Sequence, residues 1–121
     1  HAFLWWLEGN RRLSRKAREA IGDASATVFV SAASAWEITT KFRIGKLPGA
    51  ANIIDDIPGT VASQAFSPLM ITLLHAQRAG LLAGVHRDPF DRMLIAQAQI
   101  ENLLIVTNEK LFEEYGIRRL W

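Results

Sequence analysis

Three acidic residues stand where a layered α/β chain would place reactive groups. Glu37 and Asp91 each fall near the start of an expected helix, and Glu109 comes just after an expected strand. Carboxylates that converge repel one another, so such a cluster either takes up protons or recruits a cation. Hard divalent ions such as Mg²⁺ and Mn²⁺ prefer oxygen ligands, and they assist the attack of water on a phosphodiester. The three acids therefore indicate metal-assisted hydrolysis, provided that the fold brings them together.

Each of these acids also has a simpler structural interpretation. Glu37 could form a solvent-exposed salt bridge with Lys41, four residues later on the same helix. Asp91 could interact with the positive end of its helix dipole, although helical periodicity turns it toward the apolar arc of that helix. Glu109 could be the first-turn acid of the next helix. The choice between these roles and a shared site depends on the topology.

The elements that must position these acids alternate along the whole chain, which is typical of an α/β domain. Residues 31–34 are expected to form a turn, and residues 50–65 one or two short helices broken around Pro58. Because parallel strands need helical crossovers, we expect a mostly parallel sheet with helices on both faces. The active site of such a sheet lies beyond the carboxyl ends of its strands. The expected strands are 27–30, 68–72, 103–106 and 117–121, and the expected helices are 15–21, 35–44, 73–82, 89–101 and 109–115.

Length and composition restrict the class of protein. A chain of 121 residues has room for one hydrophobic core, so residues 1–121 are expected to form a single domain. The absence of cysteine excludes disulfides and cysteine-ligated metals. His75 and His86 lack the spacing of a ligand pair, which leaves oxygen as the expected metal ligand. No apolar run is long enough to span a membrane, so we expect a soluble, cytoplasmic protein with no membrane partner.

The charge distribution is compatible with an anionic partner. The net charge is only +2, but basic residues gather within residues 11–18. Such a run usually forms a solvated helix face, and the alternative is that it extends a groove that binds RNA phosphates.

The chain resembles the PIN-domain ribonucleases, and specifically the VapC-type toxins of bacterial toxin-antitoxin pairs. The resemblance extends over essentially the whole chain. It implies a three-layer α/β/α fold and an endoribonuclease that depends on Mg²⁺ or Mn²⁺, is inhibited by a cognate protein antitoxin and is usually homodimeric. Three segments carry it: HAFLWWL at 1–7, SAASAWEITTKFRIGKL at 31–47 and HRDPFDRMLIAQAQIENLLIVTNE at 86–109.

The resemblance assigns metal-binding roles to two of the acids. Glu37 matches the family glutamate of a tryptophan-glutamate pair, and Asp91 matches the aspartate that opens the DRMLIAQA helix. Glu109 stands where family members usually carry aspartate or asparagine, and its longer side chain could make the metal contact water-mediated. The candidate RNA contacts are Ser34, Arg87, Arg92 and Thr107, although the two arginines could instead pair with Asp88 or Glu101.

One family acid has no counterpart among these residues. It lies in an aspartate-threonine pair directly before the histidine that matches His1, at the end of the first strand of the fold. Either the protein extends upstream, or this version has lost a metal ligand. In both cases we expect weak or no cleavage by these 121 residues. The absence of the first strand should also leave a gap in the sheet, which another strand order or a partner chain could cover. The alternative function is a catalytically impaired module that binds RNA or antitoxin.

Overall fold

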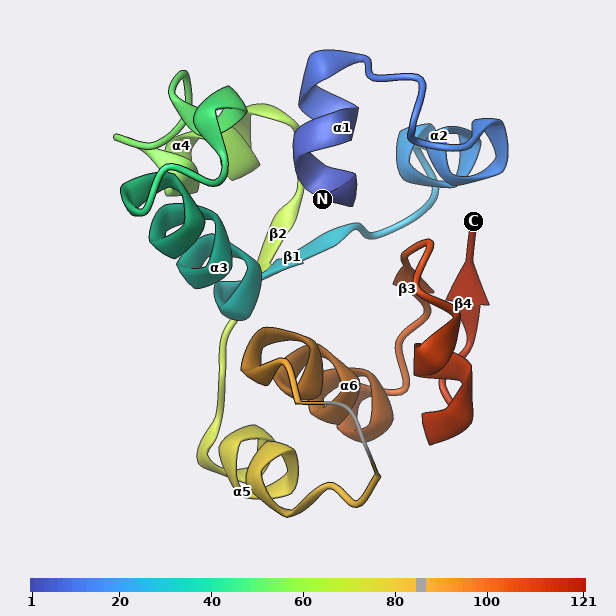
Figure 1. Cartoon of the computed structure of the whole chain (residues 1–121). Coiled ribbons are helices and arrows are strands. Elements are labelled where there is room, and N and C mark those ends of the chain that lie inside the picture. The colour runs from blue at the N-terminus through green and yellow to red at the C-terminus, as the bar shows by residue number, and fades with distance from the viewer. Residues whose placement is uncertain (85–86) are drawn as a thin grey trace.

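The structure, a computed structural model, describes residues 1–84 and 87–121. It confirms the α/β class, with helices arranged around short parallel strands (Figure 1). His86 lies outside the described residues. The α-helices are α1 (Ala2–Glu8), α2 (Arg15–Gly22), α3 (Ala32–Arg43), α4 (Ile57–Ser63), α5 (Leu73–Leu81) and α6 (Pro89–Glu101). The 3₁₀ helices are η1 (Pro48–Ala50) and η2 (Lys110–Tyr115), and the strands are β1 (Phe29–Ser31), β2 (Ser67–Leu69), β3 (Ile105–Val106) and β4 (Arg119–Leu120).

Local capping signals explain where the helices begin. The side chain of Asp88 accepts hydrogen bonds from the amides of Phe90 and Asp91, and Pro89 occupies the first turn of α6, as the sequence predicts. The expected turn at residues 31–34 is wrong, because α3 begins at Ala32. Ser31 is the reason: its hydroxyl accepts a hydrogen bond from the amide two residues later and so caps the helix.

The strands form two separate parallel pairs within the described part of the chain. β1 pairs with β2, with Phe29 opposite Ser67, and β3 pairs with β4, with Ile105 opposite Arg119. The expected parallel direction is therefore confirmed. The two pairs are not joined within these residues, which agrees with the gap expected where the first strand of the family fold has no counterpart. The strands at 103–106 and 117–121 are also shorter than expected, and the last predicted helix is of the 3₁₀ type.

The inner edges of β1 and β3 both face a cavity of about 690 Å³, here named the interstrand cleft. Successive peptide groups of a strand point to opposite sides. The carbonyl of Val28 accepts a hydrogen bond from β2, so the peptide groups of Phe29 point away from β2. Likewise, the amide of Thr107 donates to the carbonyl of Leu120 in β4, so the peptide groups of Val106 point away from β4. Within residues 1–84 and 87–121, β1 pairs with β2 alone and β3 with β4 alone.

The hydrophobic core consists of three clusters of buried side chains around the strand pairs. One joins α1, β1, α3 and α4, the second joins α6 to η2, and the third packs α2 against α1 and the C-terminal segment. Buried members of these clusters are Leu4, Val30 and Ile38 in the first cluster, Ile95 and Phe112 in the second, and Leu13 and Ala17 in the third.

No helix in the described ranges is long and apolar enough to cross a membrane.

Candidate active site

Glu37 lies in the second turn of α3 and lines the interstrand cleft. Its Oε2 is 2.6 Å from Nζ of Lys41, so the salt bridge proposed as its structural role does form. The pair is mostly buried, however, with only 17% of the Glu37 side chain and 28% of the Lys41 side chain exposed. Both residues face the cleft rather than open solvent. The salt bridge therefore belongs to the candidate site.

Asp91 approaches the same cleft from another helix. It lies in the first turn of α6, where Asp88 caps the helix, and both carboxylates line the cleft. The neighbours of the two acids also meet, because the rings of Trp36 and Phe90 pack edge to face with centroids 4.9 Å apart. The fold thus brings Glu37 and Asp91, which are far apart in the sequence, to one cavity.

The acids around the cleft affect the pKa of Lys41. Burial lowers the pKa of Lys41, but the hydrogen bond that Lys41 donates to Glu37 and the negative charges of Glu37, Asp88 and Asp91 raise it above its usual value. Lys41 therefore compensates part of the negative charge that the acids concentrate in the cleft.

Glu109 lines the cleft but serves a local role in the structure. Its carboxylate accepts a hydrogen bond of 3.2 Å from the amide of Leu111 and so caps η2. The amide of Glu109 donates in turn to the hydroxyl of Thr107, at 3.1 Å. Among residues 1–84 and 87–121, no group of three His, Asp or Glu side chains is close enough to hold a metal ion. The structure thus brings Glu37 and Asp91 together and leaves Glu109 at the rim as a capping residue.

The candidate RNA contacts fall into two groups. Ser34 and Thr107 both line the interstrand cleft. Arg87 is exposed and is not among the cleft residues. Arg92 donates to the carbonyls of Ala79, at 3.2 Å, and Leu82, at 2.7 Å, and so caps the end of α5. The two hydroxyls are therefore better placed to meet a ligand in the cleft than the two arginines are.

Comparison with known proteins identifies the family of this chain. The PIN domain family model matches residues 1–117. The chain belongs to the PIN domain family. A search among curated proteins finds no match to it. PIN domains are generally metal-dependent nucleases that bind RNA, which agrees with a carboxylate-lined cleft.

The side chains of this PIN domain fit a divalent ion. Mg²⁺ retains several waters and is usually held by only one or two carboxylates together with substrate phosphates. Glu37 and Asp91 supply two carboxylates at one cavity. Lys41 occupies one oxygen of Glu37, so an ion that binds there must displace its ammonium group. The donor chemistry therefore suits the metal that the family uses, with Lys41 as an internal competitor.

Sequence reasoning missed one buried polar residue beside this site. Gln97 of α6 also lines the interstrand cleft, and only 1% of it is exposed. A glutamine within a run of buried residues on a helix must find hydrogen-bond partners. That position, in the apolar stripe of α6, was the signal that could have identified it.

Replacing Lys41 by methionine should strengthen the binding of Mn²⁺ to this PIN domain. The substitution keeps the apolar stem but removes the ammonium group that competes for Glu37. A charge-assisted hydrogen bond contributes roughly 1.5 kcal/mol or more, so we expect about tenfold tighter binding in isothermal titration calorimetry. Lys46→Met is the control, because Lys46 is exposed and lies outside the cleft. Weaker binding in Lys41→Met would show that Lys41 supports the site instead.

Proposed function

We propose that this chain is a metal-dependent endoribonuclease that cleaves RNA phosphodiester bonds in the interstrand cleft. The observation that carries the proposal is that Glu37 and Asp91, from different helices, line one cavity beside the inner edges of β1 and β3. Membership of a family of metal-dependent nucleases supports the same chemistry. The geometry selects these two carboxylates, and the family supports the metal-dependent chemistry proposed for them.

Each cleft residue has a role in this proposal. Glu37 and Asp91 would hold the Mg²⁺ or Mn²⁺ ion, and Glu109 would reach it through water. The ion would polarise the phosphoryl oxygen and lower the pKa of attacking water. Ser34 and Thr107 would contact the RNA from the walls of the cleft, with Arg87 and Arg92 as the less well placed candidates. Exposed basic residues that could attract the phosphate backbone are Arg11, Arg12, Arg15 and Lys16.

Titration with Mn²⁺ in the presence of a structured RNA tests the proposal. The protein is used in excess over the RNA, so that slow cleavage is detected in a single turnover. We expect slow cleavage that rises with the Mn²⁺ concentration and stops when the ion is chelated. RNA that is bound in a mobility-shift assay but stays intact at saturating Mn²⁺ would contradict the nuclease and favour the binding module.

The biological role proposed for this nuclease is that of a VapC-type toxin in the cytoplasm, neutralised by a protein antitoxin. The support is the resemblance carried by residues 1–7, 31–47 and 86–109. Expression in a bacterial host tests this role. We expect growth to slow with the wild-type sequence and not with Asp91→Asn, and equal growth of the two strains would contradict the toxin.

We also propose that the chain forms a homodimer through α5. Leu73 and Leu81 lie eight residues apart on this helix, about 12 Å along its axis and within one broad face, and they are 91% and 78% exposed. Met70, just before the helix, is also exposed. Contiguous exposed apolar side chains are uncommon on monomeric proteins and often mark an interaction site. The face therefore supports a protein partner.

Charged substitutions on this face should dissociate the dimer. Sedimentation equilibrium is expected to give a dimer for the wild type and a monomer for the double variant Leu73→Glu, Leu81→Glu, because two carboxylates would then be buried at the interface without partners. The control is Ile44→Glu, another exposed apolar residue, at the end of α3. A wild-type monomer at all concentrations would contradict the proposal.

A further inference from the structure

A chain of buried hydrogen bonds connects the start of α3 to α6 at the wall of the interstrand cleft. The hydroxyl of Ser31 donates to Oε1 of Gln97 at 2.5 Å, across a separation of 66 residues in the sequence. The same hydroxyl accepts from the amide of Ala33 and so caps α3. Both side chains are buried, at 6% and 1% exposure. One hydrogen bond therefore links the cap of α3 to the third turn of α6.

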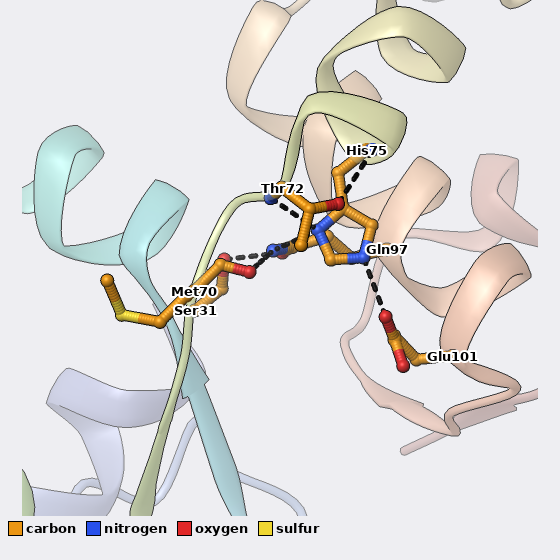
Figure 2. A network of polar contacts seen from close by, with 6 residues as sticks. All are labelled: Ser31, Met70, Thr72, His75, Gln97 and Glu101. Carbon is orange, nitrogen blue, oxygen red and sulfur yellow. Dashed lines mark hydrogen bonds and ion pairs between the residues drawn. The ribbon is translucent and has the colours of Figure 1, made fainter.

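The amide orientation of Gln97 follows from its remaining contacts (Figure 2). Its Nε2 donates to the carbonyl of Met70, at 3.3 Å, and its Oε1 must therefore be the atom that faces Ser31. Since a flipped amide would direct a donor at the Ser31 hydroxyl and an acceptor at a carbonyl, only one orientation satisfies both sides. Gln97 is thus held in a single orientation at the junction of β1, α6 and the segment after β2.

His75 of α5 extends the network to Thr72 and Glu101. The imidazole is 1% exposed, and its Nδ1 accepts from the amide of Thr72 at 3.0 Å. The proton of the neutral ring must then be on Nε2, which is 2.9 Å from Oε1 of Glu101 on α6. Nδ1 also lies 3.5 Å from Nε2 of Gln97. α5 is therefore fixed to α6 on the side opposite to α3.

These contacts join the two helices that carry the candidate metal ligands. Glu37 lies six residues after Ser31, and Asp91 lies six residues before Gln97. Six residues correspond to about 9 Å along a helix. Because helices are stiff over that length, a shift of α3 against α6 at the Ser31–Gln97 contact would displace one carboxylate relative to the other. The packing of Trp36 against Phe90, the residues just before Glu37 and Asp91, reports that alignment directly.

We propose that Gln97 is a positioning residue that, through Ser31, holds α3 and α6 in the alignment that brings Glu37 and Asp91 to one divalent ion. The inference rests on the proposed function. Gln97 itself does not contact the ion in this proposal. It acts through the helices that carry the two carboxylates, and the His75–Glu101 contact restrains α6 from the other side.

Two measurements on the variant Gln97→Leu test the proposal. Leucine approximates the volume of glutamine but removes its hydrogen bonds. In the metal-free protein we expect weaker nuclear Overhauser effects between the rings of Trp36 and Phe90. In the same variant we expect Mn²⁺ to bind about tenfold more weakly. Ser31→Ala should behave in the same way, whereas Ser31→Thr, which keeps the hydroxyl, should restore both readouts.

The matched control is Ile95→Val, a fully buried position on α6 that belongs to the core cluster joining α6 to η2. It should lower stability while it leaves the Trp36–Phe90 contact and the Mn²⁺ affinity unchanged. Unchanged ring contacts in Gln97→Leu would overturn the proposal, whether or not Mn²⁺ binds. Loss of the contacts in a protein whose wild type binds no Mn²⁺ would support the alignment role of Gln97 and refute the proposed metal function.

Discussion

Replacing Asp91 by asparagine should weaken Mn²⁺ binding by about 100-fold and abolish any metal-dependent cleavage of RNA. The change keeps the size of the side chain and one oxygen but removes the charge. Loss of groups that merely support a metal ligand typically reduces affinity 10- to 100-fold, so loss of a direct ligand should reach the upper end of that range. Calorimetric titration with Mn²⁺ and a single-turnover cleavage assay measure the two effects.

The control for this substitution is Asp55→Asn, which removes the same charge from an exposed position outside the cleft. It should bind Mn²⁺ as the wild type does. If Asp91→Asn retained wild-type affinity and cleavage, Asp91 would not be a metal ligand, and its role would be confined to the first turn of α6. Equal losses in both variants would point to a general effect of net charge instead.

Joining an apolar strand that ends in aspartate-threonine before His1 should increase both stability and Mn²⁺ affinity. The interstrand cleft lies between the inner edges of β1 and β3, whose peptide groups at Phe29 and Val106 face away from their present partners. A strand of about five residues, the usual length, could pair with both edges and join the two strand pairs. Its aspartate would add a third carboxylate beside Glu37 and Asp91, for which we expect tenfold or greater gain in affinity.

The same extension ending in asparagine-threonine separates the two effects. It should raise the urea concentration at the midpoint of unfolding as much as the aspartate version does, because strand pairing is the same. It should not raise the Mn²⁺ affinity to the same extent. If neither extension stabilised the protein, the cleft would not be a site for strand insertion, and the resemblance to the family would not extend to that aspartate.

Local signals predicted much of the fold. The side chain of Asp88 and the ring of Pro89 determine where α6 begins, and both act within a few residues. The expected bounds of α6 agree with the observed ones. The capping hydroxyl of Ser31 starts α3 at Ala32, three residues earlier than expected. Strand lengths were less predictable, because each strand is defined by a partner strand that is distant in the sequence.

The burial of the candidate site could not be predicted locally. The spacing of Glu37 and Lys41 predicted a salt bridge, and it forms. Its burial in a cleft depends on α6 and on the strand pairs, which no pattern within α3 reveals. The role of Gln97 was hidden for the same reason, since its partner Ser31 belongs to a different part of the chain.

The α/β class, the start of α6 and the candidate acids could be predicted from the sequence, because capping, periodicity and charge act over a few neighbouring residues. The folded structure was needed to see that Glu37 and Asp91 share a cavity while Glu109 caps η2. It was also needed to see that the described strands form two pairs with a cleft between them. The physical reason is that hydrogen bonds between strands and contacts between helices join segments whose separation along the chain carries no local signal.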